Sequence, residues 1–352
     1  MEKVLIAMSG GVDSSVAAYL MQQKGFACIG ATMLLCDRAL IGCEPSDNTE
    51  DARSVASKLA LPFFVLDHTL EFREKVVEPF IRCYEEGGTP NPCVECNRHL
   101  KFGILLEQAL KMGCSHIATG HYAKIEKDPN GRYLLYRAGD KSKDQTYFLY
   151  SLTQEQLSRT LFPLGELSKE KARQIAEDQG FLNARKRDSQ DICFIPDGDY
   201  LSFMARYTQK TYAAGDFLDL QGNVIGRHNG AVGYTLGQRK GLGLAMGEPV
   251  YVCAKDMEKN TVTVGADAAL FKTALRAKDW NWIAFPALSG PVRVKAKVRY
   301  RHTEQPATVY PEENGFARVE FDEPQRAITA GQAVVLYQGD LVVGGGTITE
   351  IL

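Results

Sequence analysis

The sequence predicts an α/β protein with a doubly wound parallel sheet, followed by two smaller β-rich parts. Strand-like and helix-like segments alternate through the first half of the chain, and short segments separated by Gly-rich turns follow residue 208. The length of 352 residues is enough for two or three domains. We therefore expect an α/β domain with a helical extension over 1–207, a central β-rich domain over 208–272 and a C-terminal β-barrel over 273–352.

Each element of the first domain follows from a local pattern. Apolar runs predict strands at 3–9, 28–35, 63–68 and 116–122. The segments around them predict helices at 14–24, 50–60, 70–85 and 98–112. From 151 to 182 the chain looks helical, because Thr153 and Gln156 fit a capping box and Gly180 is a suitable stop. A polar, irregular stretch follows at 183–199.

The composition is that of an ordinary soluble protein, with 45% hydrophobic residues, 24% charged residues and a net charge of −2. No apolar run is long enough to span a bilayer, and the N-terminus lacks the pattern of a signal peptide. We expect a cytoplasmic monomer without a membrane partner. The net charge neither supports nor excludes a nucleic-acid partner, because local clusters of charge decide that question.

The nine cysteines, an odd number in a chain of this length, do not suggest an extracellular disulfide scaffold. Four lie in or beside apolar stretches and are expected to be small core residues: Cys28, Cys36, Cys114 and Cys253. Cys43 and Cys83 carry no signal. Three others stand in polar, Pro-flanked contexts and require a chemical explanation: Cys93, Cys96 and Cys193.

Cys93 and Cys96 form a C-x-x-C pair in TPNPCVECNRHLKF (89–102), just before the expected helix at 98–112. This spacing suits a metal half-site, a redox couple or a reactive thiol beside a helper. Buried packing is the remaining explanation, although the surrounding Asn, Pro and Arg residues weaken it.

The loop SGGVDSS (9–15) directly follows the first expected strand and opens the first helix. Its glycines let the backbone approach a ligand closely, and exposed amides at a helix N-terminus suit a pyrophosphate-sized anion. No Lys follows the glycines, so the loop is not a Walker A motif. A tight strand–helix turn is the alternative. The loop also resembles the SGGxDS loop of the PP-loop ATP pyrophosphatases, which cleave ATP between the α and β phosphates and adenylate a carbonyl oxygen.

Ordered motifs along nearly the whole chain resemble the tRNA-specific 2-thiouridylase family of that superfamily. They are AMSGGVDSSVAA (7–18), TPNPCVECNRHLKF (89–102), ATGHYAKI (118–125), KDQTYFLYSL (143–152), SQDICFI (189–195), GYTLGQRKGLG (233–243), EPVYVCAKD (248–256) and VRYR (298–301). The resemblance implies ATP-dependent thiolation of the wobble uridine of tRNA at C2. In that family ATP adenylates the C2 oxygen, and a cysteine persulfide then delivers sulfur.

The resemblance also implies roles for individual residues. Cys193 corresponds to the persulfide-bearing cysteine and Cys96 to the second catalytic cysteine, which attacks to release the sulfur. ATP, with Mg2+, would be held by Ala7, Met8, Ser9, Gly10, Gly11, Val12, Asp13, Ser14, Met33 and Gly120. Asn91, Pro92 and Cys93 would contact the target base. Other contacts with tRNA would be made by His121, Lys143, Asp144, Gln145, Arg299, Tyr300 and Gln332. The expected partners are tRNA and a sulfur source, either a cysteine desulfurase or relay protein or free sulfide.

Position 93 departs from the family pattern, in which many members carry Asp. A thiol is a weaker hydrogen-bond acceptor than a carboxylate and has a much higher pKa, so Cys93 is no simple replacement. Together with Cys96 and Cys193 it could hold a 4Fe–4S cluster with one open iron. The alternatives are a metal-free persulfide route, with Cys93 a bystander or resolving thiol, and a zinc site with His99 as fourth ligand.

The segment RVKAKVRYR (293–301) places five basic residues at strict alternation. In a strand all five project from one face, opposite Val294, Ala296, Val298 and Tyr300, and a phosphate backbone would explain such a concentration of like charge. A solvated face of a sandwich is the alternative. Two other functions also stay open: a PP-loop ligase that adenylates a different carbonyl substrate, and a non-catalytic tRNA-binding iron–sulfur protein.

Overall fold

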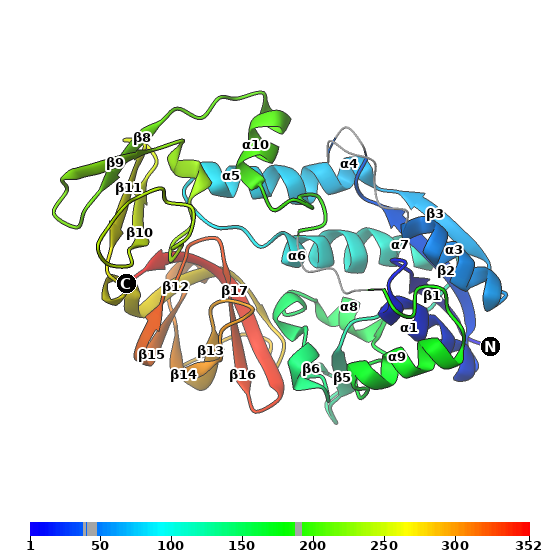
Figure 1. Ribbon diagram of the computed structural model, residues 1–352. Helices are drawn as coiled ribbons and strands as arrows, with labels where there is room; N and C mark the ends of the chain where they lie inside the picture. Colours follow the sequence, from blue (N-terminus) through cyan, green and yellow to red (C-terminus); the bar gives the residue numbers. More distant parts are fainter. Residues whose placement is uncertain (38–39, 41–47, 187–191) are drawn as a thin grey trace. The chain divides into compact units, whose positions relative to one another are not determined.

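The computed structural model describes residues 1–37, 40, 48–186 and 192–352, which form two compact units (Figure 1). The first unit comprises Met1–Val76, Cys93–Phe194 and Gly339–Val342. The second comprises Val77–Pro92, Ile195–Gln338 and Val343–Leu352. Cys43 and residues 187–191, which include Arg187 and the first three positions of SQDICFI, lie outside the described residues.

The first unit is built on a five-stranded parallel sheet of order β3-β2-β1-β4-β7. Its strands are β1 (Lys3–Ala7), β2 (Ala27–Leu34), β3 (Phe63–Asp67), β4 (His116–Ala118) and β7 (Thr160–Leu161). The predicted parallel sheet is therefore confirmed. Strand β7 lies in a segment that we expected to be helical. The sequence did not indicate this strand, because two residues are too few to give a period-2 pattern.

The helices of this half begin close to the predicted positions. They are α1 (Val12–Gln23), α3 (Asn48–Lys58), α4 (Thr69–Phe72), η1 (Arg73–Val77) and α5 (Glu78–Glu85), then α6 (Pro92–Glu95), η2 (Cys96–Ile104) and α7 (Leu105–Lys111). The last run starts six residues earlier than expected, because Pro92 occupies the first helical position, where its fixed φ is favourable. Cys93 and Cys96 consequently lie inside the helical turns and not ahead of them.

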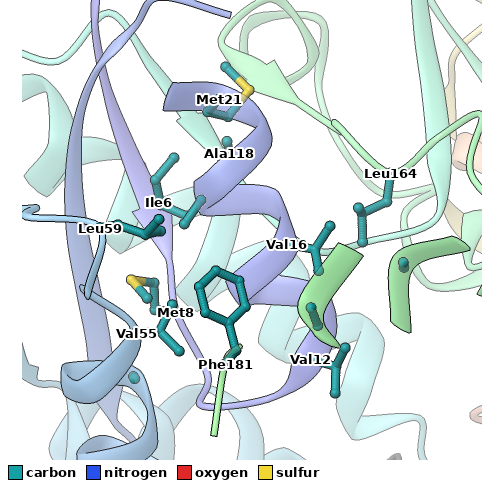
Figure 2. Packing of buried hydrophobic residues seen from close by; sticks show 14 of the residues in the cluster. Ile6, Met8, Val12, Val16, Met21, Val55, Leu59, Ala118, Leu164 and Phe181 are labelled. Atoms are coloured by element: carbon teal, nitrogen blue, oxygen red, sulfur yellow. The ribbon is translucent and has the colours of Figure 1, made fainter. Parts of the chain in front are cut away.

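The core of the first unit lies between β1, α1 and their neighbours. Figure 2 shows Phe181 between Val12 and Val16 of α1 on one side and Met8, which follows β1, on the other. The Met8 sulfur occupies the space beside Gly30, where it would lie only 2.7 Å from the Cβ of any larger residue. Met8 immediately precedes the nucleotide loop, so this packing fixes the start of the loop.

Further elements complete the first unit. They are the hairpin β5 (Ala123–Lys127) and β6 (Tyr133–Arg137), the short turns η3 (Lys141–Lys143) and η4 (Thr146–Phe148), and the helices α8 (Gln154–Ser158) and α9 (Lys169–Asp178). The predicted capping box is confirmed: the backbone N–H of Gln156 donates to the Thr153 hydroxyl, and the backbone N–H of Thr153 donates to the Gln156 side-chain oxygen. Gly180 adopts a positive φ of 60°, which confirms it as the stop after α9.

The second unit is mostly β-structure after α10 (Tyr200–Thr208). A four-stranded sheet has the order β10-β11-β8-β9, with β8 (Gly215–Leu218), β9 (Val224–His228), β10 (Tyr251–Asp256) and β11 (Thr261–Gly265). Six further strands follow the order β12-β15-β14-β13-β16-β17, and pairing of β17 with β12 closes them into the predicted barrel. These are β12 (Phe271–Trp282), β13 (Val292–Lys297), β14 (Gln305–Pro311), β15 (Ala317–Arg326), β16 (Ala333–Gln338) and β17 (Leu341–Ile351). Within the described residues no helix is both long and apolar enough to cross a membrane.

The predicted basic strand is only partly correct. Alternation holds through β13, where Val294 and Ala296 are buried in the barrel core and Lys295 is exposed. The strand ends at Lys297, so the continuation of the pattern has no strand to support it. Arg299 turns inward instead, and its guanidinium donates to the carbonyl oxygens of Leu236 and Ala327.

Two further residues depart from the predicted basic face. Arg293 pairs with Asp322, so its charge is compensated within the barrel. Tyr300, expected on the opposite face, places its ring centroid 5.4 Å from the Lys297 ammonium. A strip of five uncompensated cations is therefore absent from this described segment.

Candidate nucleotide and thiol site

The nucleotide loop leaves the carboxyl end of β1, between β2 on one side and β4 on the other. The chain passes from β1 to β2 and only later returns to β4, so this is the point at which strand order reverses. Ligands of open parallel sheets bind at such points. The predicted loop residues therefore lie where an α/β fold places a ligand.

Two glycines of the site cannot be replaced without displacing the backbone. Gly10 has a φ of 72°, and a Cβ there would lie 2.1 Å from the carbonyl oxygen of Asn48. Gly120, which follows β4, faces the start of α1: a Cβ there would lie 2.7 Å from the amide nitrogen of Ser14. Gly10 therefore lets the loop pack against the backbone of Asn48, and Gly120 lets its own segment pack against the start of α1; a side chain at either position would prevent this packing.

Internal hydrogen bonds hold the loop in place. The Ser14 hydroxyl donates to the carbonyl oxygen of Gly11 at 3.0 Å and accepts from the backbone N–H of Ser9 at 3.2 Å. The buried amide of Asn183 donates to the carbonyl oxygen of Gly10 and to the Ser15 hydroxyl, each at 2.9 Å. The loop is therefore preorganised without a ligand.

A buried ion pair joins the loop to α9. Lys169 is only 5% exposed, and its ammonium lies 2.8 Å from both carboxylate oxygens of Asp13. The Tyr122 hydroxyl donates to the same carboxylate at 2.9 Å. Neither Lys169 nor Tyr122 was among the predicted site residues, because the pairing joins positions more than a hundred residues apart and leaves no local signal.

The other predicted nucleotide residues lie beside the loop, with different exposures. Met8 and Val12 are buried in the core, whereas Ala7, Asp13 and Met33 are half-buried and Ser9 is exposed. The backbone of Met8 is engaged by β2, since its N–H donates to the Ala31 carbonyl and its carbonyl accepts from the Thr32 hydroxyl. Met8 therefore supports the loop from behind.

The helix that carries Cys96 is fixed by its neighbour. Asn97 is 2% exposed, and its amide donates to the carbonyl oxygen of Phe148 at 3.1 Å. Phe148 belongs to the KDQTYFLYSL segment, so the amide joins two of the sequence motifs. Cys96 is itself buried, whereas Cys93 and Cys193 are exposed.

The thiols predicted to be catalytic share one cation. Lys101, one turn beyond Cys96, interacts electrostatically with Cys93, Cys96 and Cys193, and in each case favours the thiolate. Burial acts in the opposite direction and dominates at Cys96, where it raises the pKa to about 12. Although Cys93 as a residue is exposed, the protein around its thiol removes that group from water and raises its pKa. Both resting thiols are therefore protonated at neutral pH.

Cys193 has a different immediate partner. A hydrogen bond joins its thiol to the thiol of Cys36. This bond, and next the removal of the thiol from water by the surrounding protein, raise the pKa of Cys193 well above its ordinary value, although the residue as a whole is exposed. Cys36, expected to be a core residue, is instead half-buried at the carboxyl end of β2. The prediction for Cys253 is wrong for a similar reason, since that thiol is also only half-buried, whereas Cys28 and Cys114 are buried as predicted.

The three predicted ligands of an iron–sulfur cluster do not form a ligand set. Across the described part of the chain, no three His, Cys, Asp or Glu side chains are grouped so that they could hold a metal ion. His99, the suggested fourth zinc ligand, has its Nε2 3.2 Å from a carboxylate oxygen of Glu95. The donor arrangement thus fits neither a cluster nor zinc, and we derive no step through either.

The predicted tRNA contacts of the first unit have local structural partners. The Asp144 carboxylate accepts from the hydroxyl of Thr146 at 2.8 Å, and the Gln145 amide oxygen accepts from the Tyr122 N–H at 2.9 Å. His121 is 9% exposed and its Nδ1 lies 2.7 Å from the Thr119 hydroxyl. Burial lowers the pKa of His121 well below its usual range, so the ring is neutral at pH 7. Lys143 is half-buried.

In the second unit, Gln332 holds the segment that leads into the cysteine helix. Its side-chain amide donates to the carbonyl oxygens of Thr89 and Pro90 at 2.9 and 3.0 Å. The Thr89 N–H donates in turn to the carbonyl oxygen of Ala330 at 2.8 Å. Asn91 follows half-buried, and Pro92 is buried.

Comparison with known proteins agrees with this arrangement. The family model described as tRNA methyl transferase HUP domain matches residues 2–197, the tRNA methyl transferase PRC-barrel domain matches 201–266, and the aminomethyltransferase beta-barrel domain matches 272–348. The tRNA-specific 2-thiouridylase MnmA of Clostridioides difficile (strain 630) is 48% identical over 357 aligned residues, covering 100% of this chain and 99% of the relative. The chain belongs to the tRNA-specific 2-thiouridylase family.

Other family members are equally similar. The MnmA of Moorella thermoacetica is 49% identical over 354 residues, and 99% of each chain is covered. Among solved structures, the U34-tRNA thiolase NcsA of Methanococcus maripaludis, which contains a [4Fe-4S] cluster, matches with a TM-score of 0.36 and 16% identity over 60% of this chain and 74% of that one. That likeness is too remote for its cluster to be transferred to a 2-thiouridylase family member.

Proposed function

We propose that the protein thiolates a uridine of tRNA at C2, with ATP as the activating substrate. The observation that carries this proposal is the presence, in one compact unit, of a preorganised anion-binding loop and of thiols that share the Lys101 cation. An adenylating loop alone fits many ligases. Thiols that can carry sulfur select thiolation among them, and the names of the 48–49% identical relatives support the same choice.

The first step is adenylation of the uridine. The C2 oxygen attacks the α-phosphorus of ATP, and pyrophosphate leaves with the bonding electron pair. Gly10 and Gly120 let backbone segments pack closely around the loop, and the amides at the start of α1, whose dipole favours negative charge, would bind the phosphates. ATP would enter as its magnesium complex, so this metal ion is part of the substrate.

The second step is sulfur transfer. The terminal sulfur of a persulfide on Cys193 attacks C2, a C–S bond forms, and AMP leaves with the electron pair of the C2–O bond. A second thiolate then attacks the Cys193 sulfur and forms a disulfide, while the sulfur on the uridine leaves as the thiocarbonyl. The family resemblance assigns that second thiol to Cys96. An external thiol reductant restores the two cysteines.

The sulfur source and the target position belong to the same proposal. We infer a persulfide donor such as a cysteine desulfurase or a relay protein, a wobble uridine as the target, and a monomer acting in the cytoplasm, where thiols are kept reduced. The division into segments 1–207, 208–272 and 273–352 remains our proposal for the domain boundaries. Cys93 stands where many family members carry Asp, and we propose that it borders the target base together with Asn91 and Pro92.

A single-turnover assay tests this function. Anaerobically purified protein with less than about 0.1 iron per chain is mixed with tRNA transcript, ATP and a small-molecule persulfide. We expect AMP and thiolated tRNA in equal amounts, the latter seen as retarded mobility in a mercury-containing gel. Cys193→Ser should form AMP without thiolated tRNA, because adenylation precedes the use of sulfur.

Two outcomes would contradict the proposal. AMP formation that does not require tRNA would identify a ligase for another carbonyl substrate. Thiolation that requires stoichiometric iron and sulfide on the protein would replace the persulfide by a cluster-bound hydrosulfide.

A further inference from the structure

The Cys36 thiol, next to Cys193, has no role in the steps above. It follows β2 by two residues and lies at the same carboxyl edge of the sheet as the nucleotide loop. Its thiol forms a hydrogen bond with the thiol of Cys193, the persulfide-bearing position. Cys96, which is buried, interacts electrostatically with Cys193.

One short segment fixes both thiols. The Phe72 ring packs edge-on against Phe194, the neighbour of Cys193, with centroids 5.5 Å apart. The next residue, Arg73, donates to both carboxylate oxygens of Asp37, the neighbour of Cys36, at 3.0 and 2.7 Å. Adjacent side chains of a single helical segment therefore hold the two cysteine-bearing segments together.

Asp37, the residue after Cys36, has a second bond besides those to Arg73. The Asp37 carboxylate accepts from the backbone N–H of Leu40 at 2.7 Å, and this bond together with the Arg73 guanidinium holds its pKa below the usual range. Phe194 is 1% exposed, so the position of Cys193 is fixed by a buried ring on its C-terminal side. The thiol–thiol contact is thus part of a constructed site.

We infer that Cys36 is a second resolving thiol, which attacks the Cys193 sulfur of the persulfide and forms a Cys36–Cys193 disulfide. This inference rests on the proposed function, because that function places the persulfide on Cys193. The new S–S bond forms as the bond from Cys193 to the terminal sulfur breaks, and the terminal sulfur takes the electron pair. Without tRNA it leaves as hydrosulfide and takes up the proton from Cys36. The persulfide is the species reduced, so no further oxidant is required.

The test uses the full chain without ATP or tRNA, so it is independent of adenylation. Protein is loaded with glutathione persulfide, freed of excess reagent under anaerobic conditions and followed by trapping hydrosulfide with a bimane reagent. Disulfide-linked tryptic peptides are then identified by mass spectrometry. Cys36 lies in the peptide 25–38 and Cys193 in 188–206.

In Cys96→Ser protein we expect hydrosulfide and the 25–38/188–206 linkage in equal amounts. Adding Cys36→Ser should slow hydrosulfide release at least tenfold and abolish the linkage. Cys28→Ser in the same background is the matched control, because Cys28 lies on the same peptide but is buried elsewhere in the core, and it should change nothing. Cys193→Ser gives the background release from other thiols.

Two results would overturn the inference: unchanged hydrosulfide release after loss of Cys36, or a linkage to Cys193 that survives in Cys36→Ser. Cys36→Ala, checked for an unchanged thermal midpoint, repeats the test without a hydroxyl at the position. If release depends on Cys36 while tRNA with ATP and persulfide gives no thiolation, the proposed function fails but the resolving thiol stands. If tRNA is thiolated but hydrosulfide release does not depend on Cys36, the proposed function stands and the resolving role of Cys36 fails.

Discussion

The nucleotide loop and the thiol site lie in the same unit but are built in opposite ways. The loop is completed by fixed groups: glycines that cannot be replaced, a buried ion pair and bonded hydroxyls. The thiols are held by neighbouring side chains, yet they are protonated at rest, and three of them share a single cation. The loop is thus ready for substrate binding, whereas the thiol site needs proton removal before it can react.

Removal of the Asp13 carboxylate, which pairs with the buried Lys169, should have the largest effect. Asp13→Asn leaves the Lys169 ammonium buried without its counter-charge, and we expect a loss of about 3 kcal/mol in unfolding free energy together with loss of AMP formation. Urea unfolding and a pyrophosphate-release assay measure the two effects. Glu177→Gln is the control, because it breaks an exposed pair with Arg185 and should cost under about 1 kcal/mol. Equal losses would mean that the loop does not depend on this pair.

The next effect separates backbone strain from lack of space. Gly10→Ala should lower the free energy of unfolding by about 2–3 kcal/mol and weaken ATP binding at least tenfold. The methyl group would clash with the Asn48 carbonyl, and alanine is also strained at the positive φ of this position. Gly25→Ala has a similar φ of 83° but open space around it, so about 1 kcal/mol is expected. Calorimetric titration with a non-hydrolysable ATP analogue gives the affinity. Identical behaviour of the two variants would remove close approach as the reason for Gly10.

The buried amides of Asn97 and Asn183 allow the thiol site and the nucleotide loop to be weakened one at a time. Asn97→Ala and Asn183→Ala each remove a buried hydrogen-bonding amide and should each cost about 1–2 kcal/mol. Asn97→Ala should slow thiolation more than AMP formation, because it releases the cysteine helix. Asn183→Ala should slow AMP formation, because it releases the Gly10 carbonyl. Rapid-quench measurement of both products decides the matter, and a uniform decrease of both steps in both variants would refute the separation.

The smallest effect requires no substitution. Because the pKa of Cys96 is raised to about 12, its thiolate fraction should rise about tenfold per pH unit from pH 7 to 10, and the rate of alkylation by iodoacetamide should follow without a plateau. Mass spectrometry of the peptide that contains Cys96 gives the rate. A plateau below pH 9 would show that Lys101 overcomes burial. AMP formation should change far less over pH 7–8, since the Cys96 thiol takes no part in the adenylation step that we propose.

Sequence patterns predicted the fold and the loop because these depend on local periodicity and spacing. The parallel sheet, the capping box at Thr153 and the stop at Gly180 are examples. Sequence patterns did not predict contacts that join distant positions. Lys169 gives no local sign of pairing with Asp13, and Cys36 follows an apolar run, so it resembled a core residue until the structure paired it with Cys193.

The basic face shows a different failure. Alternation continues to Arg301 in the sequence, but the strand ends at Lys297, and a period-2 pattern has no meaning beyond a strand end. Asp322 on β15, which only β14 separates from β13, could not have been anticipated as a partner of Arg293 without knowing the strand order. The C-x-x-C spacing of Cys93 and Cys96 likewise says nothing about the position of a third cysteine, so it could not decide between a metal site and a thiol site.

The bonds from Gln332 to the Thr89 and Pro90 carbonyls limit where the chain tolerates changes in length. Only Asn91 and Pro92 separate this anchor from Cys93, so one inserted residue would rotate the Cys93 side chain about the helix axis by roughly 100°. Fusion tags and reporter insertions should therefore avoid 86–92. The exposed turn around Gly222, where a side chain would meet nothing within 4 Å, is the better position for them.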